Sequence, residues 1–264
     1  MPSARALPIL MYHHVSPQPG LVTVSPQTFR DQIAGLARRG YRSAGCDELA
    51  AFLAGTPLPE KSVMITFDDG YLDNFVHAHP VLREFGFTAV LFLITGRIGD
   101  GLPRPAGATP DHRTCMASVK AGRADEVMLR WSEVEAMRAA GSFEFHSHTH
   151  THARWDREIA DPAERDARLA ADLEQSRTTL IARLGAASAH LCWPQGYHDA
   201  AYRRTARAAG FRYLYTVEKG TCVPTTDPQH IPRVVTKERT GNWLPSRLWL
   251  YRRPLLAAAY AAIS

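Results

Sequence analysis

The chain has 264 residues, 45% of them hydrophobic, so it can build a sizeable core and extensive disorder is not expected. Its formal net charge is only +5, with basic and acidic residues interleaved, which favours a solvated surface over a nucleic-acid groove. Four cysteines without CxxC spacing are too few for a disulfide framework, so reduced structural thiols are expected at Cys46, Cys115, Cys192 and Cys222.

The N-terminal residues contain only one short apolar run, Leu7 to Tyr12, which Pro8 interrupts. A secretory signal requires a longer apolar region, and no other segment is long and apolar enough to span a bilayer. A cytoplasmic location is therefore expected, although a mature chain that had lost its signal would look the same.

Strands and helices are predicted to alternate along the chain. Mostly apolar runs predict strands at residues 7–12, 63–67, 87–94, 143–145, 189–193 and 213–217. Apolar residues at helical spacing, with caps such as Ser25 and Asp161, predict helices at residues 26–39, 47–53, 71–85, 132–140, 161–184 and 199–209. Alternation implies an α/β fold, and this many repeats favours a parallel sheet that closes, or nearly closes, into a single-domain barrel.

Two regions interrupt this pattern. Residues 96–130 are rich in Gly, Pro and Arg and lack a clear period, which predicts a long loop or insertion over one rim. Residues 241–264 follow the predicted domain of residues 1–240 and mix aromatic and basic side chains with an apolar run, Leu255 to Ile263. This tail is interpreted either as a helix packed on the barrel or as a peripheral membrane helix on anionic lipid.

Two adjacent carboxylates stand at the end of a predicted buried strand. The apolar residues 63–67 lead directly into Asp68, Asp69 and Gly70. Like charges side by side repel unless a cation or a proton relieves them, and the glycine lets the backbone turn at once. The alternative is a solvated turn in which one aspartate caps the following helix.

Four histidines occupy alternate positions in the segment EFHSHTHTH: His146, His148, His150 and His152. In an extended strand all four would face one side, whereas in a helical turn they would pair as i and i+4. The alternative is a solvated polar loop. Two neutral imidazoles with one carboxylate of the Asp68–Asp69 pair would give a metal three protein ligands and leave positions open, which is typical of a catalytic site.

The motifs TFDDG, SHTHTH and WPQG, in this order, resemble those of the polysaccharide deacetylase family with the NodB homology domain, also called carbohydrate esterase family 4. The resemblance extends from Pro8 to about Arg233 and implies a distorted (β/α) barrel of the NodB type. It further implies that Asp68 is the catalytic base and that Asp69, His148 and His152 are the metal ligands. His146 and His150 would be neighbours of the metal, while Ser147, Thr149 and Thr151 would orient the loop.

The N-terminal motif ILMYHH resembles the permuted arrangement found in poly-N-acetylglucosamine deacetylases of biofilm systems. By that resemblance His13 is the general acid that protonates the departing amine. His14 is the weaker candidate, because successive side chains on a strand point to opposite faces. His14 is instead expected to contact the substrate, together with Trp193 and Pro194.

The segment LCWPQG departs from the usual third motif of the family, since Gln195 replaces an aromatic residue and no arginine precedes it. The backbone N–H of Gln195 could still hold the oxyanion, because that contact does not depend on the side chain. Arg233, in the segment IPR, resembles a PR motif of the permuted subgroup and could replace the missing arginine by keeping Asp68 ionised. The alternative places Arg233 on a surface strand.

These features predict a metal-dependent de-N-acetylase acting on an N-acetylhexosamine unit of a cell-envelope polysaccharide or of a lipid-linked sugar. Zinc is the expected metal, although cobalt, nickel and iron also suit two imidazoles and a carboxylate. One alternative is a catalytically impaired carbohydrate-binding protein, because of the altered LCWPQG motif. A non-haem iron oxygenase also uses two histidines and a carboxylate, but it would leave Asp68 without a role.

Overall fold

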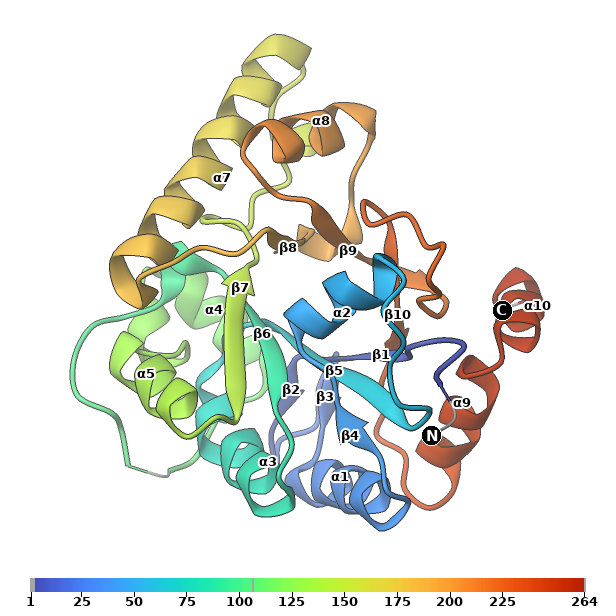
Figure 1. The fold of residues 1–264 in the computed structure, drawn as a ribbon. Coiled ribbons are helices and arrows are strands. Elements are labelled where there is room, and N and C mark those ends of the chain that lie inside the picture. The colour runs from blue at the N-terminus through green and yellow to red at the C-terminus, as the bar shows by residue number, and fades with distance from the viewer. Residues whose placement is uncertain (1–2, 106, 264) are drawn as a thin grey trace.

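Seven parallel strands form a closed barrel within residues 3–105 and 107–263, which this computed structural model describes (Figure 1). In ring order they are β1 (Ile9–Tyr12), β10 (Ile231–Val235), β9 (Tyr213–Lys219), β8 (His190–Cys192), β7 (Phe143–Ser147), β6 (Ala89–Leu93) and β5 (Ser62–Asp69). The ring closes because β1 pairs with β10 on one side and with β5 on the other. The predicted barrel is therefore confirmed.

Three further strands are short. β4 (Arg42–Ser43) pairs with the beginning of β5, and β2 (His14–Val15) forms a separate parallel pair with β3 (Thr23–Val24). β1 ends at Tyr12 and β2 begins at His14. His13 is the single residue between them, so it lies at the carboxyl end of the first barrel strand. Sequence reasoning did not predict these short pairings.

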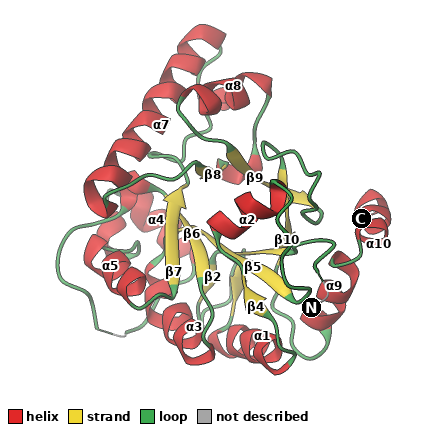
Figure 2. Cartoon of the chain, viewed as in Figure 1, coloured by secondary structure: helices red, strands yellow, loops and turns green. Residues whose placement is uncertain are grey.

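Helices surround the barrel, as the red ribbons in Figure 2 show. They are α1 (Pro26–Arg38), α2 (Cys46–Leu53), α3 (His79–Phe85), α4 (His112–Lys120), α5 (Trp131–Ala139), α6 (Trp155–Glu158), α7 (Pro162–Leu184), α8 (Ala200–Ala208), α9 (Trp243–Tyr251) and α10 (Pro254–Ile263). Side-chain caps begin several of them: Ser25 accepts a hydrogen bond from the Thr28 N–H, and Asp161 accepts one from the Glu164 N–H. The two caps predicted from the sequence are thus observed.

The core has an outer and an inner part. Outside the barrel, Ile65 and Phe67 of β5 pack with apolar side chains of α1 such as Phe29. Inside it, the preceding residue Met64 packs with residues of α2, including Leu49 and Phe52, and α2 lies across the barrel in Figure 1. The strand β5 is therefore buried on both faces, as its continuous apolar run predicts.

The predicted helix over residues 71–85 is divided into two pieces. A single π-helical turn, Asn74–Ala78, precedes α3, and Pro80 lies in the first turn of α3. Proline has no N–H to donate to the carbonyl four residues earlier, so a regular α-helix cannot continue through this position.

Residues 96–130 are more ordered than a long loop. They contain α4 and two 3₁₀ turns, Thr95–Arg97 and Ala124–Glu126, and a buried cluster joins Cys115, Val127 and Met128 to Tyr71. Single bridges Tyr71↔Met128 and Gly99↔Arg130 attach the segment to the rim of the barrel. The sequence predicted a long loop or insertion over one rim and did not indicate the helix within it, because α4 has too few turns to show a clear apolar period.

The C-terminal tail forms two helices that pack on the barrel. Leu244, Leu248 and Tyr251 of α9 and Ala257 of α10 are buried in the outer core. In Figure 1 both helices lie beside the N-terminus. Among the described residues, no helix combines the length and apolar character needed to cross a membrane.

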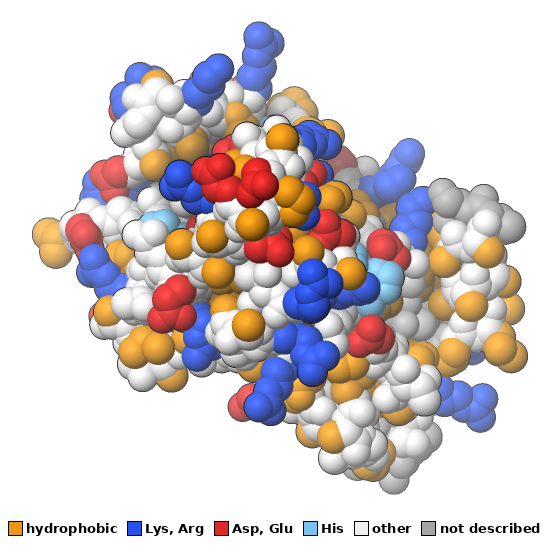
Figure 3. Space-filling model, turned by 90° about the horizontal axis from the view of Figure 1, so that it is seen from above, with side chains coloured by type: hydrophobic (Ala, Val, Ile, Leu, Met, Phe, Trp, Pro, Cys, Tyr) orange, Lys and Arg blue, Asp and Glu red, His pale blue; other side chains and the backbone are white. Residues whose placement is uncertain are grey.

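The surface carries charges of both signs. On the face shown in Figure 3, the side chains of Lys and Arg, of Asp and Glu, and of hydrophobic residues are interspersed. The four cysteines are free and buried, in agreement with their predicted structural role.

Candidate active site

A cavity of about 290 Å³ opens where the carboxyl ends of the barrel strands meet. Its lining comes from six chain segments that are distant in sequence: His13, Leu21, Val22, Asp68, Asp69, Tyr71, Arg97, His112, Met116, His148, His152, Trp193, Gln195 and Val217. The structure thus brings together both aspartates, two of the four clustered histidines and His13. Functional residues of (β/α) barrels lie at this end, which makes the cavity the candidate active site.

Asp68 is held by a fully buried arginine. Arg233 of β10 donates two parallel hydrogen bonds to the Asp68 carboxylate, at 2.7 and 2.8 Å. Burial alone would raise the pKa of Asp68, but the charge and hydrogen bonds of Arg233 lower it below the usual value overall. Asp68 is therefore ionised at neutral pH, and Arg233 lies inside the barrel rather than on a surface strand.

Asp69, His148 and His152 converge on one point. Asp69 Oδ1 lies 3.3 Å from His148 Nε2 and 3.6 Å from His152 Nε2, and one ligand atom from each of the three residues lies within 4.8 Å of the others. Asp68 points to Arg233 instead, so the two adjacent carboxylates have different partners. The separation of one aspartate beside two histidines from a second, ionised aspartate is consistent with the roles that the family resemblance implies.

The donor set fits a divalent cation. The Nδ1 atom of His148 is 2.8 Å from the Cys192 carbonyl and so carries the proton, which leaves Nε2 facing the Asp69 carboxylate. His148 Nε2 and the Asp69 carboxylate then both present lone pairs to each other, so a proton or a metal ion must lie between them. Burial lowers the pKa of His152 to about 3, so this imidazole is neutral and available as a ligand.

A network of hydrogen bonds shapes the loop that carries these histidines. Ser147 Oγ accepts a hydrogen bond from the Thr149 N–H, and Thr149 Oγ1 accepts one from the His152 N–H. The Thr151 hydroxyl donates to Asp172 Oδ2 at 3.1 Å. These three contacts are consistent with the orienting role that the family resemblance implies.

Asp172 of α7 holds the same loop from below and was missed from the sequence. Its Oδ1 atom accepts hydrogen bonds from the N–H groups of His150 and Thr151, at 3.0 and 2.8 Å. The signal was present, because Asp172 lies on the buried stripe of α7 between Leu169 and Leu173. A charged residue on an apolar helix face requires partners, and here they are the backbone donors of the loop.

His146 and His150 do not line the cavity. His146 lies within the barrel, with Nδ1 hydrogen-bonded to Ser188 Oγ, and His150 Nδ1 is 3.0 Å from Thr95 Oγ1. Neither regular geometry considered for the four histidines is adopted. The strand β7 ends at Ser147, and the left-handed backbone of Thr149 and His152 turns the chain so that His148 and His152 meet.

His13 and His14 point to different environments. His13 lines the cavity, with Nε2 3.7 Å from Asp68 Oδ2, and burial lowers its pKa below the usual value. His14 is fully buried outside the cavity, where Nδ1 pairs with Asp73 at 2.5 Å and Nε2 meets His112 at 3.1 Å. The expectation that His14 contacts the substrate does not fit this position, since the side chain is not accessible.

The WPQG segment lies at the end of β8. Trp193 lines the cavity, but Pro194 is buried and does not. Gln195 has a left-handed backbone, with φ of 55°, and its side-chain carbonyl accepts a hydrogen bond from Arg154 at 3.1 Å. Gln195 therefore lines the cavity with its side chain held by Arg154.

Several residues that line the cavity belong to no sequence motif and were not predicted. Tyr71, Arg97, His112 and Met116 come from the segment after β5 and from the 96–130 region. The rim is apolar: Leu21, Val22, Met116 and Val217 are large hydrophobic side chains that remain exposed to solvent. Scattered single residues of this kind are not readable from a sequence, since exposed hydrophobic residues are common in general.

The fold and the site define an α/β barrel in which histidine and carboxylate side chains gather in one cavity at the carboxyl ends of the strands. Residues 55–214 match the sequence profile of the polysaccharide deacetylases, and the chain belongs to this family. The predicted resemblance is thus confirmed.

Two relatives indicate the sequence distance. A Staphylococcus aureus protein named poly-beta-1,6-N-acetyl-D-glucosamine N-deacetylase is 23% identical over 227 residues, which cover 85% of this chain and 71% of that protein. YxkH of Bacillus subtilis is 42% identical over 94 residues, which cover 35% of this chain and 33% of that protein. The second match therefore spans only a third of the relative's length.

Two solved structures share the fold. IcaB from Ammonifex degensii superimposes with a TM-score of 0.74 and 24% identity, covering 95% of this chain and 99% of that one. The Streptococcus pyogenes deacetylase PplD, in complex with acetate, gives a TM-score of 0.76 with 20% identity, covering 96% and 100% of the two chains. These matches extend over nearly the whole chain and support a NodB-type barrel.

Proposed function

We propose that this deacetylase is a metal-dependent de-N-acetylase that hydrolyses the acetamide of an N-acetylhexosamine unit in a cell-envelope glycan. The observation that carries the proposal is that the two adjacent carboxylates have different partners. The ion pair with Arg233 keeps Asp68 ionised, whereas Asp69 points to the imidazoles of His148 and His152. A base and a ligand set are therefore available in one cavity without competing for the same carboxylate.

Asp69, His148 and His152 would hold the metal. A divalent cation at this position, with zinc as first choice, would supply a Lewis acid for the water and for the acetamide carbonyl. The hydrogen bond from His148 Nδ1–H to the Cys192 carbonyl keeps this imidazole in the tautomer that a ligand needs. Cobalt, nickel and iron suit the same ligands, so the donor set does not select one metal.

Asp68 would act as the general base that takes a proton from the attacking water. A base must be ionised at the working pH, and Arg233 lowers the pKa of Asp68 enough to ensure this. Arg233 also donates to Thr66 Oγ1 and to the Thr216 carbonyl, which fixes the guanidinium and so the carboxylate. Arg233 is a positioning residue in this scheme, since it acts through Asp68.

His13 would protonate the departing amine. Because burial lowers its pKa, the imidazole is neutral in the resting site and has to acquire the proton during turnover. Asp68 Oδ2, 3.7 Å from His13 Nε2, is placed to pass on the proton taken from water. The backbone N–H of Gln195 would stabilise the oxyanion. Trp193 is only 1% exposed, so it would shape the wall of the cavity rather than stack on the sugar.

The named relatives support an N-acetylglucosamine polymer as the substrate. The Staphylococcus aureus relative carries poly-beta-1,6-N-acetyl-D-glucosamine in its name, and its match extends over most of both chains. The apolar rim of Leu21, Val22, Met116 and Val217 would pack against the C–H faces of neighbouring sugar units.

The test is acetate release from a panel of acetylated oligosaccharides and lipid-linked sugars, together with elemental analysis of the purified protein. Asp68→Asn should retain the metal and lower kcat by about 10²- to 10⁴-fold, the usual contribution of a general base. Asp199→Asn, at the cap of α8 and outside the cavity, is the control.

Unchanged turnover in Asp68→Asn would remove the base assignment. Substrate binding without acetate release in the metal-loaded wild type would favour a carbohydrate-binding protein instead. Dioxygen consumption with the substrate would favour an oxygenase.

A further inference from the structure

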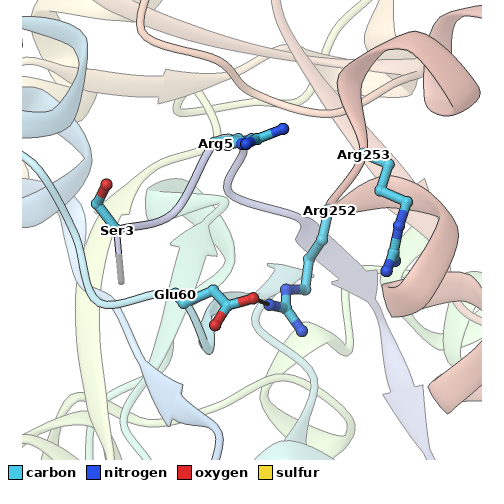
Figure 4. A pocket seen from close by; sticks show the side chains of 5 residues that line it. All are labelled: Ser3, Arg5, Glu60, Arg252 and Arg253. Carbon is cyan, nitrogen blue, oxygen red and sulfur yellow. Dashed lines mark hydrogen bonds and ion pairs between the residues drawn. The ribbon is translucent and has the colours of Figure 1, made fainter. Parts of the chain in front are cut away.

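A second large cavity, of about 500 Å³, lies between the two ends of the chain. It is lined by Ser3, Arg5, Glu60, Arg252 and Arg253, and we call it the arginine cavity (Figure 4). Arg5 comes from the segment before β1, and the other two arginines follow the last turn of α9. None of these residues takes part in the proposed reaction.

The arginine cavity is positively charged. Three guanidinium groups face it with a single carboxylate, Glu60, which pairs with Arg252 at 2.5 Å. Arg252 also donates to the Tyr41 hydroxyl. Two positive charges thus remain unbalanced within the cavity.

Arg5 and Arg253 provide these two charges. Within the described part of the chain, the side chain of Arg5 makes no hydrogen bond or ion pair, and it is exposed. Arg253 donates only to the Trp249 carbonyl, and its guanidinium stacks on the Trp249 ring at 4.1 Å. Both groups are free to bind an anion such as a phosphate, for which the guanidinium fork is well suited.

Apolar side chains adjoin the same cavity. Trp249 is 54% exposed, and Leu255 and Leu256, which open α10, are 87% and 42% exposed. The Trp249 ring contacts Arg253, and Leu255 and Leu256 follow Arg253 closely in the chain, in the first turn of α10. Cationic and aromatic groups beside exposed leucines are typical of a surface that rests in a membrane interface.

We propose that the arginine cavity and the adjoining residues Trp249, Leu255 and Leu256 dock on an anionic lipid bilayer, with lipid headgroup phosphates in the cavity. Arg247, a further arginine of α9, does not belong to this surface, because its guanidinium lies over the rings of Trp243 and Tyr260. The third arginine of the cavity is instead Arg5, from the N-terminal segment. This inference does not depend on the proposed deacetylase reaction.

The position of the arginine cavity determines how the catalytic cavity is oriented relative to the bilayer when the protein docks. Arg5 and Glu60 precede β1 and β5, whereas His13 and Asp68 stand at the far ends of the same parallel strands. At about 3.3 Å per residue, the eight residues of β5 separate the two regions by about 26 Å. A docked protein would therefore open its catalytic cavity towards the aqueous phase, which favours a glycan chain extending away from the membrane over a sugar at headgroup level.

Vesicle sedimentation tests the docking. The full chain should bind vesicles of 70% phosphatidylcholine and 30% phosphatidylglycerol but not vesicles of phosphatidylcholine alone. Each arginine at an anionic surface strengthens partitioning by about fivefold, so Arg5→Gln/Arg253→Gln should bind about 25-fold more weakly. The control Arg168→Gln/Arg207→Gln removes two exposed arginines from α7 and α8 and should bind like the wild type. Equal binding to both vesicle types, no binding, or equal losses in both variants would overturn the proposal.

A fluorescence experiment tests the orientation. The native cysteines are buried, so a single added thiol can be labelled selectively with an environment-sensitive dye. A dye at Leu255→Cys should shift to the blue on anionic vesicles, whereas a dye at Leu21→Cys, on the rim of the catalytic cavity, should not. A shift only at Leu21→Cys would refute the orientation.

Competition with inorganic phosphate separates two sources of the anion. If the cavity recognises headgroups in a bilayer, 10 mM phosphate, about the concentration of a common buffer, should leave vesicle binding nearly unchanged, since the apolar contacts add to the charge interaction. Loss of vesicle binding in phosphate, with saturable phosphate binding in the absence of vesicles, would identify a free phosphate site and refute the lipid surface.

Discussion

The buried pair of Arg233 and Asp68 allows a quantitative test of the proposed base. In Arg233→Met a side chain of similar length loses its charge, and the carboxylate, only 3% exposed, is left without its cation. Removing one partner of a buried ion pair costs about 3–5 kcal/mol of stability. Because Arg233 makes both of its ionic hydrogen bonds to the same carboxylate, we expect a loss within this range at neutral pH.

The pH dependence of this loss has a definite sign. In the wild type the pKa of Asp68 lies below that of the unfolded chain, about 3.9, so the pair stabilises the fold above that pH and the stabilisation is lost as pH falls through the folded value. In Arg233→Met the main group that lowers the pKa of Asp68 is lost, so burial raises this pKa against only the weaker influence of His13 and His148. The folded variant then binds the extra proton, so its deficit relative to wild type should be smaller at pH 5 than at pH 8.

Activity should follow the same shift. Asp68 must be ionised to act as a base, so the acid limb of the kcat/KM profile should move to higher pH in Arg233→Met. Urea unfolding at pH 5 and 8 measures the stability, and acetate release between these values measures the profile. If Arg233→Met does not fold, Arg233→Lys keeps the charge but loses the bidentate geometry and should show smaller changes of both kinds.

A matched control separates stability from chemistry. Arg104 pairs with the fully buried Glu133 at 2.7 Å, and neither residue lines the catalytic cavity. Arg104→Met should lower stability without moving the acid limb. The reasoning is refuted if Arg233→Met folds with an unchanged profile, or if Arg104→Met moves it equally.

Three further substitutions test the assigned roles. His148→Ala should abolish metal binding while His150→Ala retains it, as elemental analysis would show; the reverse would mean that the wrong histidines were assigned. His13→Ala should keep its metal but lower kcat by about 10²- to 10⁴-fold, and full activity would exclude it as the acid. Asp172→Asn should weaken metal affinity by about 10- to 100-fold in chelator competition, since it holds the ligand loop from outside the ligand set. An unchanged affinity would assign Asp172 to folding alone.

Much of the catalytic rim was predictable because parallel strands deliver their carboxyl ends to one place. The apolar runs that end at His13, Asp68 and Trp193 are continuous and short, and the structure shows barrel strands at each. Polar residues directly after such runs were therefore expected to meet across long sequence separations. This reasoning needs only the period of the strands and their parallel order.

The last barrel strand, β10, was not predicted because it contains a proline, which is rare in strands paired on both sides. Proline lacks the N–H of a sheet ladder, and Pro232 is the second residue of β10, a strand that is paired on both sides. The register between β10 and β9 is irregular between Ile231 and Arg233, so the ladder accommodates the proline at a bulge. This irregularity directs Arg233 into the barrel, where it meets Asp68, and neither feature can be read from the residue pattern.

The direction of the two aspartates also depends on a backbone state that has no sequence period. Consecutive side chains of a strand point to opposite faces, yet Asp68 and Asp69 both line the cavity. Asp69 adopts a left-handed φ of 76° and Gly70 follows at 90°, which turns the second carboxylate towards the histidine loop. Among the described residues, the other non-glycine residues with positive φ also lie at this cavity or in its histidine loop: Val22, Thr149, His152 and Gln195. Each such conformation costs about 1–3 kcal/mol, so the barrel beneath has to hold the cavity against strain at several points at once.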